Sequence, residues 1–218
     1  MKLDTKLQGK RVLITSGPTW APIDNVRVIS NTATGQTGVL LAKKFMQQGC
    51  RVTLLLGPVN IATLDNKIRV KRFCFFNELN TLLKDELRED YDIVIQSAAI
   101  SDFVPISSSN KKISSRCKTL KLVLKPTLKI INCLRKIKPK AILVGFKFEP
   151  NLMANKLINK TRNLIKSAQL DLAVGNNLLD KQYNAYLISK TETHGPFSSK
   201  PEMVNNLIKL VERKYARK

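Results

Sequence analysis

The chain has 218 residues, 43% of them hydrophobic, and its 38 Lys and Arg against 16 Asp and Glu give a formal net charge of +22. This length allows one sizeable core, so we expect a single domain over residues 1–218. No stretch approaches the roughly 18 uninterrupted apolar residues of a membrane-spanning helix, and the N-terminus lacks the apolar segment of a signal peptide. We therefore expect a cytoplasmic protein with no membrane partner.

The positive charge does not by itself identify a partner, because nucleic acids, anionic lipids and phosphorylated small molecules are all attracted to a basic surface. The Lys and Arg residues are spread along the chain, so a solvated basic surface and attraction of phosphorylated substrates both stay open. The cysteines have none of the paired spacings that bind zinc or form redox motifs. We expect no metal site among them and free structural thiols at Cys50, Cys74, Cys117 and Cys133.

Short apolar runs alternate with amphipathic segments along most of the chain. The runs predict strands at 11–15, 51–56, 91–96, 141–146 and 170–174. The amphipathic segments predict helices at 38–48, 77–90, 128–137, 151–168 and 201–214. This alternation is typical of an α/β, Rossmann-like three-layer fold, in which helices cover both faces of a mainly parallel sheet.

Residues 102–124 interrupt this alternation. They read DFVPISSSNKKISSRCKTLKLVL, polar and rich in serine at first and alternating later. We expect a mobile loop followed by an edge or intersubunit strand, with a plain surface insertion as the alternative. The segment follows the strand predicted at 91–96, and open α/β sheets bind ligands at the carboxyl ends of their strands. Its position therefore favours a role at a ligand site.

Glycine-containing turns follow the first two predicted strands and open the first predicted helix. Gly17 and Thr19 lie in the turn after the first strand, and Gly57 begins the turn after the second. Gly35 and Gly38 lead into the helix, whose free amides and dipole favour an anion. Close packing of the helix on the sheet is the alternative explanation for the last two.

Two polar side chains near these turns suit acyl or phosphoryl transfer. Asn31 precedes the glycine turn, and its amide can orient a carbonyl or stabilise an oxyanion. Lys112 lies in the loop after the strand predicted at 91–96 and can cover negative charge that develops on a phosphate. A turn-forming asparagine and a solvated lysine are the structural alternatives. The single histidine, His194, is distant in sequence from both, which argues against histidine-based catalysis.

Seven segments, in order from residue 10 to about residue 177, together resemble the phosphopantothenoylcysteine synthetases. They are GKRVLITSGPTWAPIDNVRVISNTATGQTG, RVTLLLGPV, SAAISDFVP, KKISS, TLKLVLKPTLKII, ILVGFKFE and LDLAVGNN. The resemblance implies a ligase of coenzyme A biosynthesis. In that reaction the carboxylate of 4'-phosphopantothenate attacks a nucleoside triphosphate, pyrophosphate leaves, and L-cysteine attacks the resulting acyl nucleotidylate.

The same resemblance implies roles for individual residues. Asn31 matches the asparagine that binds the acyl intermediate, and Lys112 matches the loop lysine needed to form it. Asp102 matches an aspartate that contacts the nucleotide. Phe146 matches an aromatic residue beside the base, and Ala99 should offer backbone contacts there.

The resemblance also implies cofactors and partners. The loop that begins at Pro126 matches a loop at the nucleotide, and Mg²⁺ is expected with CTP or ATP. The family is dimeric, so we expect a homodimer with residues 102–124 involved in it. No flavin is expected, because the flavin-dependent decarboxylase fused to many bacterial relatives is not among the matched segments.

The chain departs from the family pattern at positions that bear on nucleotide choice. Two lysines that help some relatives to select CTP fall near Leu164 and Ala168, with Lys166 adjacent but out of register. Thr127 replaces a common aspartate, and Gln36 replaces a common lysine in the glycine turn. We therefore expect no strict preference between CTP and ATP.

Two other classes share part of this pattern. An NAD(P)-binding Rossmann oxidoreductase has the same fold class, but no G-x-G-x-x-G follows the first strand and no acidic residue ends the second. A basic nucleic-acid-binding protein fits the net charge of +22, but the chain lacks an aromatic and basic platform of the RRM or OB kind. We expect no nucleic-acid partner.

Overall fold

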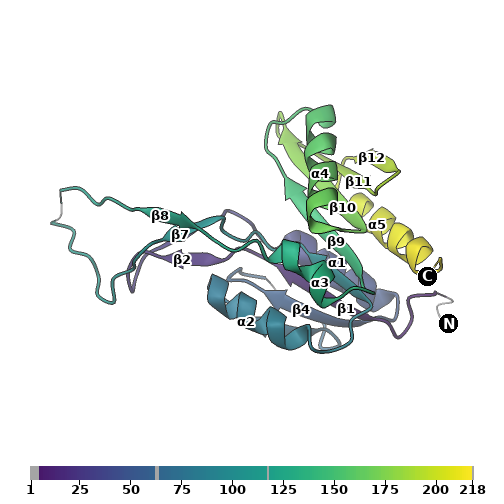
Figure 1. The fold of residues 1–218 in the computed structure, drawn as a ribbon, viewed down its shortest axis with the longest axis horizontal. Helices are drawn as coiled ribbons and strands as arrows, with labels where there is room; N and C mark the ends of the chain where they lie inside the picture. The colour runs from purple at the N-terminus through teal and green to yellow at the C-terminus, as the bar shows by residue number, and fades with distance from the viewer. Residues whose placement is uncertain (1–4, 62–63, 117, 218) are drawn as a thin grey trace.

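An eight-stranded sheet forms the centre of the protein (Figure 1). The computed structural model describes residues 5–61, 64–116 and 118–217. The strand order is β12-β11-β10-β9-β6-β1-β4-β5. Pairing is parallel from β5 to β10, and β11 and β12 continue the sheet in antiparallel pairing. The strands are β1 (Arg11–Ser16), β4 (Arg51–Leu56), β5 (Arg69–Arg72), β6 (Ile93–Gln96), β9 (Ile142–Phe148), β10 (Leu172–Leu179), β11 (Gln182–Ile188) and β12 (Thr193–Phe197).

Helices cover both faces of the sheet. The α-helices are α1 (Gln36–Gln47), α2 (Phe76–Glu86), α3 (Leu134–Ile137), α4 (Ala154–Ala168) and α5 (Lys200–Tyr215), and a short 3₁₀ segment, η1 (Ile130–Cys133), precedes α3. Alternate strand residues supply two cores: Val12 and Ile14 pack under α1 and α5, whereas Leu13 packs on the side of α2, α3 and α4. In the described part of the chain, no helix is both long and apolar enough to cross a membrane.

The predicted fold class is confirmed, and each predicted strand corresponds to a strand of the sheet. The helix predicted at 128–137 is wrong in part, because its first half is the 3₁₀ segment η1. Sequence analysis missed β5, whose sequence RVKR contains no apolar run. It also missed β11 and β12, which form an antiparallel extension in place of a further βαβ unit.

An arm extends from the carboxyl edge of the sheet (Figure 1). It consists of two antiparallel hairpins, β2 (Trp20–Pro22) with β3 (Val28–Ser30), and β7 (Phe103–Pro105) with β8 (Leu124–Pro126). We call residues 20–30 and 102–126 the arm. The strand expected late in 102–124 corresponds to β8, which is an edge strand paired with β7 of the same chain.

A buried carboxylate joins α2 to β5 near the opposite, amino edge of the sheet. Glu86 has a side chain only 3% exposed, which forms ion pairs with Arg69 and Lys71 and accepts a hydrogen bond from the Tyr91 hydroxyl. Burial raises the pKa of Glu86, but the hydrogen bonds from Lys71 and Tyr91 and the charge of Arg69 outweigh it and lower the pKa overall. A lowered pKa in the folded state means that this stabilisation is present above the ordinary glutamate pKa and is lost as the pH falls.

We expect Glu86→Gln to lower the free energy of unfolding at pH 7 by about 2 kcal/mol, because it leaves Arg69 and Lys71 without their carboxylate partner. Urea denaturation measures the change, and the difference from the wild type should narrow as the pH falls through the lowered pKa of Glu86. Glu89→Gln is the matched control, since the Glu89–Arg11 pair is exposed and should contribute less than about 1 kcal/mol. Equal losses in the two variants would contradict this account.

Candidate active site at the carboxyl edge of the sheet

The turns after β1 and β4 pack directly against each other. Gly17 has a φ of +81°, in the region that favours glycine. A Cβ atom on Gly57 would overlap the carbonyl oxygen of Pro18, and a Cβ atom on Gly17 would lie 3.2 Å from the Cα atom of Gly57. The backbone amide of Gly57 donates to the carbonyl of Ser16 at 2.8 Å. Close backbone packing therefore accounts for both glycines and fixes the shape of this edge.

Helix α1 begins in a glycine turn against the ends of β1 and β6. Gly35 is the N-cap with a φ of +72°, and no side chain caps the amides of the first turn. A Cβ atom on Gly38 would overlap the side chain of Ser16 and lie 2.9 Å from Ser97 Oγ. Gly38 thus permits close packing of α1 on the sheet, while the uncapped amides after Gly35 keep the polarity that attracts an anion.

Asn31 lies at the base of the arm and is held against the segment that follows β6. Its Nδ2 atom donates to the carbonyl oxygen of Ala99 at 2.9 Å. The same carbonyl accepts from the amide of Thr19 at 3.3 Å, and the amide of Ala99 donates to the carbonyl of Gly17 at 2.9 Å. The structure therefore brings four predicted site residues together, with the Asn31 side chain still exposed.

Buried hydroxyl groups fix the backbone beside Asp102. Thr19 is fully buried, and its Oγ1 accepts from the amide of Ser101 at 3.0 Å. Thr127 Oγ1 donates to the carbonyl of Ser101 at 2.7 Å, and the Thr127 amide donates to the carbonyl of Asp102 at 2.9 Å. The Thr19 and Thr127 side chains are therefore occupied within the protein. The Asp102 carboxylate is exposed and forms no ion pair or side-chain hydrogen bond with the described residues.

The remaining predicted nucleotide contacts lie on neighbouring segments of the same edge. Pro126 ends β8, paired with Phe103 on the arm. Phe146 is half-buried near the end of β9, on the face covered by α1 and α5.

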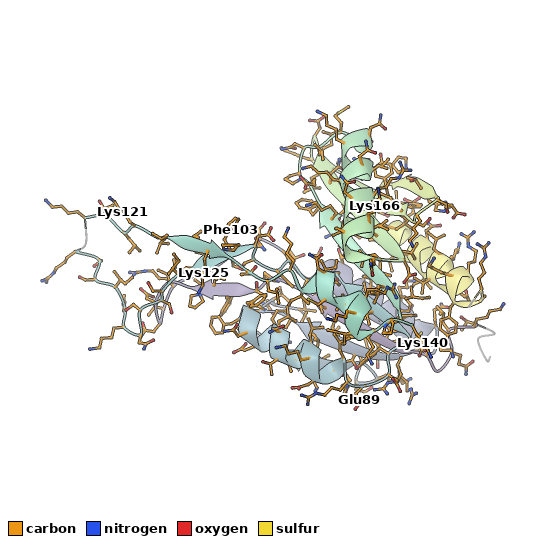
Figure 2. All side chains as sticks on the ribbon, in the orientation of Figure 1. Glu89, Phe103, Lys121, Lys125, Lys140 and Lys166 are labelled. Atoms are coloured by element: carbon orange, nitrogen blue, oxygen red, sulfur yellow. The ribbon has the colours of Figure 1, made fainter. Side chains whose placement is uncertain are left out.

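Leu164 and Ala168, near which the resemblance places lysines that help to select CTP, are apolar and packed. Ala168 is buried in α4, and Leu164 packs over β9, where its Cδ2 atom would lie 3.6 Å from a Cβ atom on Gly145. Lys166 is exposed on another side of α4 (Figure 2). Neither packed residue offers a polar group to a base.

Gln96 ends β6 with a buried amide that has no partner. The residue is 6% exposed, and neither Oε1 nor Nε2 forms a hydrogen bond with the described residues. In the sheet it pairs with Thr15 on one side and Gly145 on the other. Sequence analysis missed this residue, although a glutamine at the end of the otherwise apolar run IVIQ was a visible signal. An unpartnered buried amide costs about 1–3 kcal/mol, so Gln96 is a polar group at the candidate site that a water molecule or a ligand would satisfy.

A second buried carboxylate holds the loop that carries Lys112. Asp24, in the β2–β3 turn, accepts from the backbone amides of Val26, Arg27 and Ile113 at 2.8, 2.7 and 3.1 Å. The Arg27 guanidinium donates to Asp24 at 2.9 Å and to the carbonyl of Ile113 at 3.2 Å. These contacts, led by the hydrogen bond from Ile113, lower the pKa of Asp24 to about 2. We call Asp24 and Arg27, with the backbone of Ile113 that they hold, the clamp. Sequence analysis missed it, although Asp24 and Arg27 belong to the stretch PIDNVR of the first resembling segment.

The structure does not bring Lys112 and Asn31 together. In the β2–β3 hairpin the pair Trp20–Ser30 lies at the base and Pro22–Val28 lies near the tip. Asn31 follows the base, whereas Asp24 and Arg27, which hold the loop that carries Lys112, lie in the turn at the tip.

Cys50, Cys74 and Cys133 are free, as predicted, and Cys117 lies outside the described residues. Burial is the main cause that raises the pKa of Cys50 to about 12, so this thiol stays protonated at neutral pH. Within residues 5–61, 64–116 and 118–217, no group of three or more His, Cys, Asp or Glu side chains could hold a metal ion.

Comparison with known proteins identifies the family. The sequence profile of the DNA/pantothenate metabolism flavoprotein C-terminal domain matches residues 7–215. The chain belongs to this family. It is 35% identical over 214 residues to the coenzyme A biosynthesis bifunctional protein CoaBC of Methanocaldococcus jannaschii, covering 95% of this chain and 52% of that protein. With the CoaBC protein of Thermococcus kodakarensis it shares 37% identity over 174 residues, 79% of this chain and 42% of that protein.

The chain therefore spans about half the length of these curated relatives. Among solved structures, the DNA/pantothenate metabolism flavoprotein from Streptococcus pneumoniae superposes with a TM-score of 0.85 at 23% identity, covering 94% of this chain and 100% of that one. A Cab2 mutant in complex with phosphopantothenate-cysteine superposes with a TM-score of 0.75 at 23% identity, covering 95% of this chain and 88% of that one. These structures share the fold, and the family expected from the seven segments is confirmed.

We expect Asp24→Asn to loosen the loop that carries Lys112, because a neutral amide holds Arg27 and the three backbone amides less strongly. Tryptic cleavage at the Lys and Arg residues of 106–123 should become several-fold faster in the native protein. Asp102→Asn is the matched control, since the Asp102 carboxylate has no partner in the described part of the arm. Cleavage at the wild-type rate in Asp24→Asn would show that other contacts hold the loop.

We expect Gln96→Met to raise the free energy of unfolding of the ligand-free protein by about 1 kcal/mol, because it replaces an unpartnered buried amide with an apolar group of similar size. Urea denaturation measures the change. Gln47→Met, at an exposed position of α1, should stay within about 0.5 kcal/mol of the wild type. A loss of stability in Gln96→Met would mean that the amide has a partner in the free protein.

Proposed function

We propose that this chain is a phosphopantothenate-cysteine ligase of coenzyme A biosynthesis, a single cytoplasmic domain over residues 1–218. The observation that carries the proposal is the hydrogen bond from Asn31 to Ala99 at 2.9 Å, in a chain of this family. It holds an amide side chain at the carboxyl edge, four residues before the uncapped N-terminus of α1. Membership of this family favours a ligase over an NAD(P)-binding oxidoreductase or a nucleic-acid-binding protein.

The proposed reaction has two steps. The carboxylate of 4'-phosphopantothenate attacks the α-phosphate of CTP or ATP, the bond to the β-phosphate breaks, and pyrophosphate leaves. The amine of L-cysteine then attacks the acyl carbon of the acyl nucleotidylate, and the nucleoside monophosphate leaves. In this scheme Lys112 covers the charge that builds up in the first step, and Asn31 orients the acyl group for the second. The uncapped amides after Gly35 bind a phosphate.

The residues beside Asp102 form the proposed nucleotide site. Magnesium enters with the triphosphate, and one exposed carboxylate fits this mode, since Mg²⁺ is commonly held by one or two carboxylates together with substrate phosphates. Asp102 is such a carboxylate, and Thr127 fixes its backbone. Phe146 and the backbone of Ala99 contact the base, with Pro126 behind them. Gly17, Thr19, Gly38 and Gly57 maintain the close packing that shapes the site.

Base selection in this proposal is weak. Strong discrimination needs polar groups that a wrong base leaves unpaired, at about 1–3 kcal/mol for each group. Leu164 and Ala168 supply none. Both ATP and CTP should therefore serve as co-substrates, and no flavin takes part in this reaction.

The arm supports a homodimer. Apolar side chains are exposed along it, including Val26 (63%), Phe103 (55%), Ile106 (56%) and Val123 (66%), and Figure 2 shows Phe103 on the arm. Such a concentration of exposed apolar surface is typical of an interface, and a second copy of the chain would cover it. The net charge of +22 then attracts phosphorylated substrates rather than nucleic acid or a membrane.

The purified protein should release pyrophosphate from CTP or ATP when phosphopantothenate, cysteine and Mg²⁺ are present, and form phosphopantothenoylcysteine. Lys112→Gln should slow pyrophosphate release by about a hundredfold, the loss typical for one transition-state donor. Asn31→Asp should still release pyrophosphate in a single turnover but accumulate the intermediate, because a carboxylate repels the anionic acyl nucleotidylate. Single-turnover assays of both products measure the two steps.

Lys111→Gln is the matched control for Lys112→Gln, since it removes a neighbouring charge from the same loop. No pyrophosphate with either nucleotide would reject the ligase proposal, and release of ADP and phosphate would indicate an acyl phosphate instead. Equal rates of pyrophosphate release in Asn31→Asp and Lys112→Gln would show that the first step is wrongly assigned to Lys112 and the second to Asn31.

A further inference from the structure

A cavity lies at the amino edge of the sheet, on the side opposite the candidate active site. Its volume is about 680 Å³, and it is lined where β1, β4 and β5 begin. Pockets for small molecules have volumes of roughly 300–1,000 Å³. In Figure 2 the arm lies at the carboxyl edge of the sheet, and Glu89, in the loop after α2, lies near the amino edge. Neither the resemblance nor the proposed reaction uses this cavity.

Four cationic side chains line the cavity, and none of the described lining residues is acidic. Arg11, Arg51 and Arg69 are the first residues of β1, β4 and β5, and Lys67 shortly precedes β5. The parallel register places Arg11 beside Arg51 and Arg69 beside Thr53. Neighbouring like charges repel each other, and nearby negative charge lowers this cost.

Two of the four cations are held in place by the protein. Arg69 donates through Nε to Thr53 Oγ1 at 3.2 Å and through Nη2 to the Tyr91 hydroxyl at 3.1 Å. Arg11 pairs with Glu89 at 3.1 Å, and its guanidinium lies 5.1 Å from the centre of the Tyr91 ring. A guanidinium that is already held in place loses little freedom when it binds an anion.

The other two cations have no such partner. The side chains of Arg51 and Lys67 are exposed and form no ion pair or hydrogen bond with the described residues. Glu86 and Glu89 offset much of the charge of Arg69 and Arg11, whereas no described residue forms an ion pair with the side chain of Arg51 or Lys67. The cavity therefore keeps a net positive charge.

We infer that this cavity binds a diphosphate or triphosphate group, separately from the candidate active site. Adjacent strands are about 4.8 Å apart, so the cations from β1 to β5 extend over roughly 10 Å. This extent suits a chain of phosphates better than a single phosphate, and arginine forks recognise phosphate oxygens in pairs. Inorganic pyrophosphate and a nucleoside polyphosphate share this chemistry. The inference is independent of the proposed ligase activity.

The test compares the binding of inorganic pyrophosphate, tripolyphosphate, ATP and adenosine to the full chain by isothermal titration calorimetry in magnesium-free buffer. In Arg51→Gln/Lys67→Gln, the affinity of one class of polyphosphate site should fall at least tenfold. The affinity of the second class, at the candidate active site, should stay unchanged. The thermal unfolding temperature of the ligand-free variant should be no lower than that of the wild type, because neither side chain has a partner to lose and the repulsion between the cations is reduced. The matched control, Lys43→Gln/Lys209→Gln, removes the same charge from exposed positions of α1 and α5 and should bind as the wild type does.

The probes also distinguish the two sources of the phosphate group. Equal binding of pyrophosphate and ATP identifies the phosphates alone as the ligand, whereas tighter binding of ATP identifies a nucleoside polyphosphate. Wild-type binding by Arg51→Gln/Lys67→Gln would overturn the inference. An equal loss in the Lys43 and Lys209 control would also overturn it, because the attraction would then come from the overall charge.

Discussion

The close approach of α1 to the end of β1 is the constraint on which the carboxyl edge depends. Any side chain at Gly38 would overlap Ser16, and any side chain at Gly57 would overlap the turn after β1. Because the turns after β1 and β4 and the start of α1 are packed backbone to backbone, little space is left for side chains between them. The polar groups at this packed contact are therefore mainly backbone amides and carbonyls, with the Asn31 side chain held against them and the Asp102 carboxylate exposed beside them.

The two buried carboxylates, Glu86 and Asp24, lie at opposite ends of the protein and hold different elements together. Glu86 joins α2 to the sheet near the amino edge, where two cations and a tyrosine hydroxyl keep it ionised. Asp24 joins the two hairpins of the arm, and most of its partners are backbone amides. The first contributes to the stability of the domain, whereas the second fixes the path of a loop. This clamp, built mainly on backbone amides, fixes the path of the loop and does not engage the side chain of Lys112.

Positive charge is concentrated differently at the two edges of the sheet. At the carboxyl edge, the positive charge is the partial charge of the uncapped amides that begin α1. At the amino edge, it comes from arginines that begin three adjacent strands. Parallel pairing is the common cause, because it gathers all strand beginnings at one edge and all strand ends at the other.

The sequence by itself determined the α/β class, the central parallel strands, the family and the position of Asn31, because apolar runs and ordered motifs are local signals. Only the tertiary structure decided that Gly38 and Gly57 serve packing, that Thr19 is buried against Ser101, and that Gln96 has no partner. It also decided that Asp24 holds Ile113 from 89 residues away and that three strand-initial arginines share one cavity. These features depend on which segments lie side by side, and neither composition nor spacing along the chain specifies such contacts.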